Sequence, residues 1–220
     1  MVPFTKRLPF DVTFDDGALT VPAGATATGV LEVVSEHGFI WDRLAFWSGD
    51  NPSLSMKIID EDAGRAFSNA RIPVDLISGD GLYPYYLPTK TYLRPQQVLV
   101  VEVNNSSGAP VDCAPVLRGF KLPPEERALR EQLEAKRKTV YWHHRALTLA
   151  AAVGANDTQR VEVAAEAPFL WQELQSDVLA GWDFELRAQS EGVYFQNTPI
   201  PIESIAGNGQ RPGRLPVPRE

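Results

Sequence analysis

The sequence contains a single cysteine, Cys113, among its 220 residues. No disulfide can form within the chain, so the fold must be held together by packing alone. The chain also lacks an apolar run of the roughly 18 residues that a membrane span needs. Its start, MVPFTKRLPF, has no apolar segment of signal-peptide length. These absences predict a soluble protein that is made in a cytoplasm.

Positive charge is also scarce, because the formal net charge is −7 and the pI is about 5.1. A protein that binds nucleic acid needs a cationic face for the phosphates, so the sequence argues against such a partner. The 18 prolines and 16 glycines suit a chain of short strands and turns.

Recognisable catalytic and metal-binding motifs are missing as well. Neighbouring histidines on a strand point to opposite faces, so His143 and His144 are poorly placed to chelate one ion. The segment DEDAG at 60–64 resembles the start of a calcium loop but lacks the later acidic ligand, which favours a plain turn. Cys113 is expected to be a buried structural thiol. The sequence therefore predicts no enzyme, no cofactor and no metal site.

An internal repeat is the strongest positive feature of the sequence. Residues 56–88 align without a gap with residues 184–216, at an offset of 128, and 11 of the 33 pairs are identical. Composition alone would give about two identities. Upstream, FIW at 39–41 returns as FLW at 169–171, an offset of 130. We conclude that the chain contains an internal duplication of domain size.

The repeated residues are typical of β-structure. Apolar residues alternate, as in Ile72, Val74 and Leu76, and FDDGALT at 14–20 has the composition of a hairpin turn. Many short strands with regular turn signals indicate an all-β protein of two tandem β-sandwich domains, jelly-roll-like in type. We place the first domain at 1–122 and the second at 141–220.

One spacer helix is expected between the two domains, in the linker 123–140. Pro124 suits a first helical position, and Glu126–Arg130 is an i,i+4 pair of opposite charge. Its apolar stripe, made by Leu129, Leu133 and Val140, is too thin for a buried helix. We expect this stripe to lie against one domain or a neighbouring chain.

The second copy is shorter than the first. In the first copy 33 residues follow Pro88 up to and including Lys121, whereas only VPRE follows the equivalent Pro216. The difference is two strands, whose loss would leave a sheet edge unpaired. Three explanations stay open: the sequence is a piece of a longer chain, a neighbouring subunit donates strands, or the amino-terminal arm covers a smaller second domain.

Residues found in one copy only are free to serve a particular role. YPYY at 83–86 is matched by RPGR at 211–214, and Trp47 has no aromatic twin. Exposed aromatic side chains suit protein contacts or sugar stacking. Packing against the adjacent turn is the alternative for the tyrosines. The candidate contact residues are Trp47, Tyr83, Tyr85 and Tyr86.

The order of these motifs resembles a family of phage structural proteins with β-sandwich domains. The motifs are GRAFSNARIPVDLISGDG, YPYYLP, a strand running into VNNSSG, and a closing strand ending in VLRGFKL. The resemblance covers the first copy nearly whole, through Val98–Ser106 and Val116–Lys121, and the second copy to Glu220. It carries no catalytic residues.

What the resemblance implies is a non-enzymatic structural component of a virus particle, which decorates, cements or bridges capsid or spike and fibre proteins. Its partners would be other virion proteins and copies of itself, without nucleic acid or membrane, and its location the virion. Two alternatives stay open: a carbohydrate-binding β-sandwich module that stacks sugars on Trp47 and the tyrosines, and an accessory domain of an enzyme.

Overall fold

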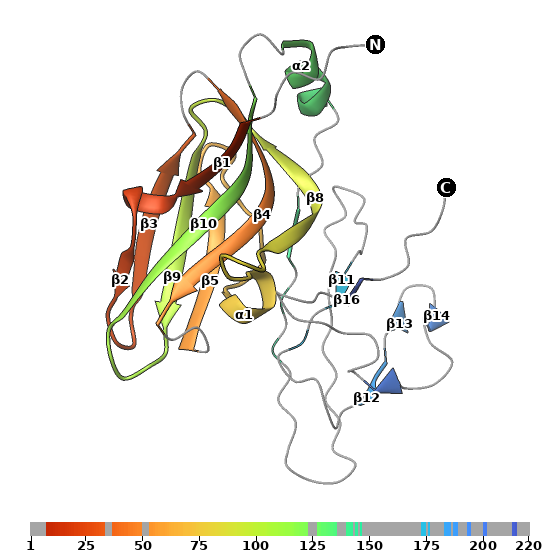
Figure 1. The fold of residues 1–220 in the computed structure, drawn as a ribbon. Coiled ribbons are helices and arrows are strands. Elements are labelled where there is room, and N and C mark those ends of the chain that lie inside the picture. The colour runs from red at the N-terminus through yellow and green to blue at the C-terminus, as the bar shows by residue number, and fades with distance from the viewer. Residues whose placement is uncertain are drawn as a thin grey trace.

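The first half of the chain forms a two-layered β-structure (Figure 1). The computed structural model describes residues 8–33, 37–49, 53–122, 127–135, 140–142, 144 and 146, and then 173–174, 176, 183–185, 187–188, 193–194, 200–201 and 213–214. Most of the predicted second domain, 141–220, therefore lies outside the described residues.

The first sheet is antiparallel and has β10 near its centre. Its strands run in the order β1 (Leu8–Thr13), β10 (Val111–Leu122), β4 (Gly38–Ser48) and β8 (Tyr85–Leu93), and β2 (Leu19–Val21) also pairs with β10. Because β1 and β2 pair with different ends of β10, they share one edge of it.

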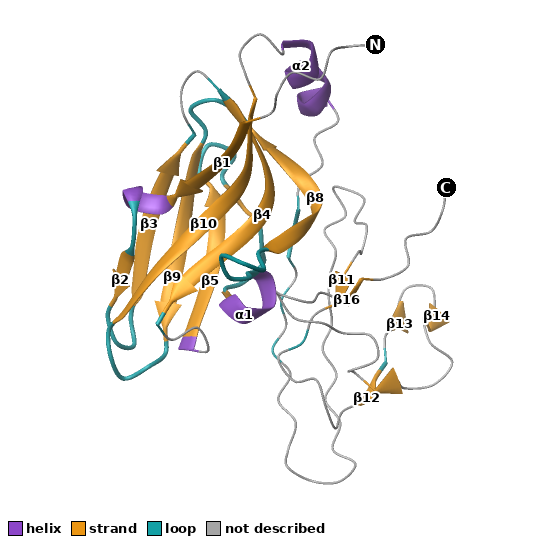
Figure 2. Ribbon diagram, in the orientation of Figure 1, coloured by secondary structure: helices purple, strands orange, loops and turns teal. Residues whose placement is uncertain are grey.

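The second sheet is also antiparallel and packs against the first (Figure 2). Its order is β3 (Thr26–Glu32), β9 (Val98–Asn105), β5 (Leu54–Asp60) and β6 (Arg65–Ala66), with β7 (Ile72–Pro73) also paired to β5. The prediction of an all-β fold is confirmed. The two strands expected between Gln97 and Leu122 are also confirmed, as β9 and β10.

The core lies between the two sheets and is built by alternation. Along β5, Leu54, Met56 and Ile58 are buried while the residues between them are partly exposed. Trp41 from the first sheet meets the ring of Phe67, beyond β6, edge to face with 5.7 Å between the ring centroids. Burying each such side chain contributes about 1.5–3 kcal/mol.

Two local predictions were wrong. The stretch 14–20 does not form a hairpin: a short 3-10 turn, η1 (Phe14–Asp16), leads from β1 to β2, and both strands pair with β10 instead of with each other. The alternation from Ile72 does not continue as a strand, because the chain turns into the one-turn helix α1 (Val74–Ile77). Ser78 closes that turn through its backbone N–H and its hydroxyl, both donated to the Val74 carbonyl.

The predicted turn at DEDAG is confirmed. Residues 61–64 form the turn between β5 and β6, and Asp60 accepts a hydrogen bond from the Ala63 N–H at 3.2 Å. Gly64 has a φ of +61°, in the left-handed region that glycine adopts at little cost. The carboxylate therefore organises the turn.

The predicted helix is present as α2 (Arg127–Ala135), and its expected ends lie outside the described residues. Leu129 and Leu133 pack on the outer face of the first sheet, against a buried group of three residues, Ile40, Tyr92 and Leu122. The expectation that the apolar stripe lies against one domain is confirmed for these two leucines. In the part of the chain that the structure describes, no helix is long and apolar enough to cross a membrane.

Beyond α2 the chain returns to the first half. Val140 is buried in the same core as Trp41, and Trp142 packs against that core. The backbone of Trp142 also forms a parallel bridge with Ser68. We call the described residues of this segment, 140–142 and 144, the strap. The first folded unit therefore includes contacts from residues that the sequence analysis placed at the linker's end and beyond it.

Three short strand pairs in the second half repeat pairings of the first half. The pairs are β11 (Glu173–Leu174) with β16 (Gly213–Arg214), β12 (Asp183–Phe184) with β15 (Ile200–Pro201), and β13 (Arg187–Ala188) with β14 (Val193–Tyr194). Asp183 faces Pro201 as Ser55 faces Pro73. The pair β13–β14 follows β5–β6 at the same offset of 128.

The third pair, β11–β16, follows β4–β8 in the same way, with β11 displaced by 130 residues and β16 by 128. These are the two offsets that the sequence repeat has in the corresponding segments.

Candidate contact surface

A row of polar and aromatic side chains crosses the outer face of the first sheet. Asp11, Arg118, Arg43 and Tyr86 stand opposite one another on β1, β10, β4 and β8. Arg118 forms an ion pair with Asp11 at 3.2 Å. The guanidinium carbon of Arg43 lies 5.7 Å from the centroid of the Tyr86 ring, within cation–π range. The row therefore links four strands on one surface.

Asp42 supports this row from a β-bulge in β4. Its carboxylate accepts a hydrogen bond from Arg43 Nε at 3.0 Å and also lies 3.8 Å from Lys90 Nζ. Burial alone would lower the pKa of Arg43, but the hydrogen bond and charge of Asp42, together with Tyr86, outweigh it and raise that pKa. Arg43 therefore stays charged beneath the tyrosine.

The loop before β8 is held close to this row. Gly79 makes a parallel bridge with Ala45, and a Cβ atom on Gly79 would lie 1.8 Å from the Tyr83 carbonyl oxygen, so only glycine fits there. Asp80 Oδ1 accepts hydrogen bonds from the N–H groups of Leu82 and Tyr83 at 2.8 and 2.6 Å.

On its other side the loop is tied to β10, because Arg118 Nη1 donates a hydrogen bond to the Gly81 carbonyl at 2.8 Å. The same arginine pairs with Asp11, so it connects the loop to the row on the sheet face. The loop is therefore fixed at three points.

This fixed loop and the start of β8 together present a group of large side chains to solvent. The exposed fractions are 85% for Leu82, 67% for Tyr83 and 54% for Tyr86. We call these three residues the aromatic loop. Tyr85 is only 2% exposed, because successive residues of β8 point to opposite faces and Tyr85 faces the core. Tyr85 is therefore part of the packing, unlike the other predicted contact residues.

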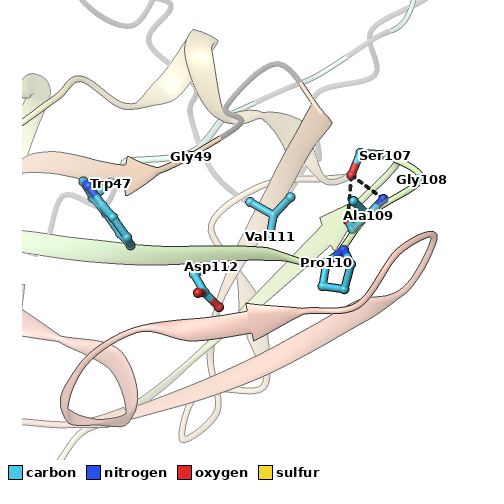
Figure 3. A pocket seen from close by; sticks show the side chains of 8 residues that line it. All are labelled: Trp47, Gly49, Ser107, Gly108, Ala109, Pro110, Val111 and Asp112. Carbon is cyan, nitrogen blue, oxygen red and sulfur yellow. Dashed lines mark hydrogen bonds between the residues drawn. The ribbon is translucent and has the colours of Figure 1, made fainter.

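Trp47 lies on the same face of β4 as Arg43, four residues along the strand and thus about 13 Å away. It is 59% exposed and faces Ala114 of β10. An open groove of about 580 Å³ runs beside it and is lined by Trp47, Gly49 and residues 107–112 (Figure 3). Trp47 and the aromatic loop therefore lie apart on the outer face, because Tyr86 of the loop stands opposite Arg43.

The far wall of the groove is the turn between β9 and β10, which the Asn-rich motif builds. The Asn105 side chain is fully buried and donates to the carbonyls of Val21, Pro22 and Ala109 at 3.1, 3.3 and 2.8 Å. Its Oδ1 accepts from the Ser107 N–H at 2.8 Å. One side chain therefore joins this turn to the end of β2.

Reactive groups are not gathered on this surface. Cys113 is buried, and burial, with Asp112 nearby, raises the pKa of its thiol to about 11. Thiolate is the nucleophilic form, so this cysteine is suppressed as a nucleophile. Among the described residues, no group of three or more His, Cys, Asp or Glu side chains is arranged to hold a metal ion. The chemistry that the surface offers is contact and stacking.

The aromatic loop could be found from the sequence only by comparing the two copies. Arg43 and Arg118, which order it, gave no signal, because each lies in an ordinary strand pattern. No family model matches the chain, and no curated protein matches it.

Proposed function

We propose that the protein is a non-enzymatic structural component of a phage particle, where it decorates, cements or bridges capsid or spike and fibre proteins. The observation that carries the proposal is the aromatic loop, in which Leu82, Tyr83 and Tyr86 are exposed on a support fixed by Asp80 and Arg118. Aromatic side chains are enriched where proteins bind one another, and a rigid support lowers the entropic cost of binding.

We further propose that the fold is a jelly roll. Counting β1 with β2 and β6 with β7 as single positions, eight strands form two four-position sheets, and successive strands change sheet except from β5 to β6 and β7, which stay in the second sheet. In space β10 lies between β1 and β4, and β9 lies between β3 and β5. That order is the one expected of two interleaved Greek keys, an architecture common in viral capsid and lectin domains.

The tandem arrangement is the third part of the proposal. The repeated pairings of β11–β16, β12–β15 and β13–β14 are what a second sandwich of the same plan would contain. Two domains that dock on different neighbours give a bridging protein avidity from modest single contacts.

Fractionation of particles tests the virion role. Particles from the source are banded in a density gradient, and each fraction is probed with an antibody against this protein. The protein should band with the particles and should stay with them after a salt wash. A protein found only in the soluble fractions would overturn the proposal.

The groove beside Trp47 supports one alternative, a carbohydrate-binding module. An exposed indole next to the carboxylate of Asp112 can stack on a sugar ring and bond its hydroxyls. A glycan array separates the two functions, because a bridging protein shows no sugar-dependent signal. Binding that Trp47→Ala abolishes and Tyr83→Ala leaves intact would favour the module.

A further inference from the structure

The strand β3 is the outermost strand of the second sheet (Figure 1). It pairs with β9 along its whole length without a register shift. The Val30 N–H is donated to a side chain of another segment, so Val30 and Val100 form a non-hydrogen-bonded pair. Because the pattern alternates along an antiparallel ladder, every second residue of β3 turns its backbone groups away from β9. These residues are Thr26, Thr28, Val30 and Glu32.

The composition of β3 does not protect this outer edge. Its sequence, TATGVLE, has neither lysine nor proline, and its single charge is on the last residue, Glu32. The residues that face outward include two threonines and Val30, which is 46% exposed, and β-branched side chains favour strand pairing. A regular edge of this composition is a template for pairing with another chain.

The other edge strands of the two sheets each carry a feature that discourages such pairing. The strand β8 contains Pro88 and Lys90, and its ladder with β4 has a register shift. The strands β1 and β7 contain Pro9 and Pro73. The strands β2 and β6 have only three and two residues. Among the described strands of the first half, β3 is thus the edge that its own sequence and length leave open.

Asp15, in η1, covers this edge instead. The turn η1 lies against β3, and Asp15 Oδ1 accepts the hydrogen bond from the Val30 N–H at 2.9 Å. A carboxylate oxygen at this distance stands where the carbonyl oxygen of an added strand would accept the same N–H. A Cβ atom on Gly29 would lie 3.1 Å from Asp15 Oδ2, so the glycine leaves room for the carboxylate. The carboxylate therefore takes the place of a neighbouring strand.

The backbone of Asp15 adopts a strained conformation at this contact. Its φ of 47° and ψ of 34° lie in the left-handed region, which residues other than glycine use sparingly. Phe14 before it is fully buried, and the Gly17 N–H closes the turn by donating to the Phe14 carbonyl at 3.1 Å. Strain that persists because the surrounding structure holds it is typical of a residue with a role of its own.

We propose that Asp15 is an edge guard: its hydrogen bond to β3 keeps that strand from pairing with the β3 strand of a second copy of this chain. A second copy fits the edge because two identical antiparallel strands are related by a two-fold axis, so each offers the other the same outward-facing groups. Such pairing would join the second sheets of two chains into one continuous sheet. The proposal goes beyond the virion role and does not depend on it.

Replacement of Asp15 tests the guard. Asp15→Gly removes the carboxylate and also relieves the positive φ, so the fold should be kept. Asp15→Asn keeps an oxygen acceptor and tolerates the same backbone conformation. Circular dichroism checks the folding of each variant, and light scattering compares its mass with that of the natural chain at equal concentration. Asp15→Gly should have at least twice the mass of the natural chain, and Asp15→Asn should have the same mass.

Two further variants control for charge and locate the contact. Asp62→Gly removes the same charge and a similar hydrogen bond, from the Val98 N–H at 3.2 Å, but Val98 belongs to β9, which already has a strand on each side. It should keep the natural mass. Thr28→Pro removes an outward-facing N–H of β3 that β9 does not use, so adding it to Asp15→Gly should restore the natural mass. Should Thr28→Pro prevent folding, Thr28→Lys places a charge on the same edge.

A folded Asp15→Gly chain with the natural mass overturns the proposal. A folded chain that carries both Asp15→Gly and the Thr28 substitution and still associates does so too, because the contact would then lie outside β3. Equal association of Asp62→Gly would also contradict the guard, since the loss of one negative charge would then be enough. Association of Asp15→Asn to the same extent would show that the hydrogen bond to Val30 does not protect the edge.

Discussion

Across the strands β4 and β8, the first half of the chain sets Arg43 against Tyr86, whereas at the corresponding place in the second half β11 and β16 set Glu173 against Arg214. The pairing is kept while the side chains change. The sequence leading into the second strand of each pair also differs, because LYPYY at 82–86 stands where the second half has QRPGR at 210–214. In these described pairs the two halves therefore share the strand pairing and differ in the residue types at the paired positions.

The residues that both copies keep differ in kind from the residues that only one copy has. Gly79, which fits only without a Cβ, has a twin in Gly207, and Asn69 has one in Asn197. Tyr83 and Tyr86, which are exposed, have become arginines. We therefore expect the two halves to bind different neighbours, one through apolar contact and the other through charge.

The largest expected effect comes from the core tryptophan. Trp41→Ala should lower the free energy of unfolding by about 3–5 kcal/mol, because it leaves a cavity beside Phe67 and Trp142. Trp171→Ala, at the equivalent position, should cost a similar amount if the second half forms the same core. Calorimetry of the full chain measures both. A Trp171→Ala variant with unchanged stability would show that the second half does not form the same core.

The next largest effect on stability is expected for the buried hydrogen bonds of Asn105. Asn105→Ala removes three donated hydrogen bonds and one accepted one, and it should destabilise the first unit by about 2–3 kcal/mol. Asn104→Ala is the matched control, since Asn104 lies at the surface next to it, and should cost less than half as much. Urea unfolding gives both values. Equal losses of stability in the two variants would show that the hydrogen bonds of Asn105 contribute no more than those of Asn104.

Cys113 gives a pH-dependent effect of similar size. Its pKa rises from 9.0 to about 11 on folding, so the thiol contributes stability that is complete below pH 9 and is lost as the pH rises toward 11. The loss should reach roughly 2 kcal/mol. Cys113→Ala should lack this slope when unfolding is followed from pH 8 to 11. A variant with the same slope as the natural protein would contradict the assignment.

The smallest effect on stability is expected for the aromatic loop. The double variant Leu82→Ser, Tyr83→Ser should change the free energy of unfolding by less than about 0.5 kcal/mol, because both side chains are exposed. Binding to purified particles should nevertheless fall at least tenfold, as a pull-down would measure. Trp47→Ser, an exposed aromatic outside the loop, is the control and should bind normally. Unchanged binding by the double variant would show that the contact with the particle lies elsewhere on the protein.

The alternation of apolar residues predicted the strands correctly. The predictions were wrong where tertiary contacts determine the local structure. The patterns at β5, β9 and β10 were sufficient because their buried residues recur at every second position. The alternation at 72–77 misled, because Val74, Leu76 and Ile77 face the core equally well from a single helical turn.

The strap and the burial of Tyr85 could not be predicted from the sequence for another reason. Val140 and Trp142 bind a site that forms only when Trp41, Phe67 and Asn69 come together from distant parts of the chain. The inward direction of Tyr85 likewise depends on the phase of β8, which the letters YPYY do not reveal.

The account depends most on whether the second half repeats the strand pairing of the first. Paired cysteines test this directly, since residues facing each other on antiparallel strands are close enough for a disulfide. Ser55→Cys with Pro73→Cys and, separately, Asp183→Cys with Pro201→Cys are oxidised, and the cross-links are mapped by mass spectrometry. We predict rapid cross-linking within the chain for both pairs. A bond that forms in the first half and not in the second would contradict the repeated plan.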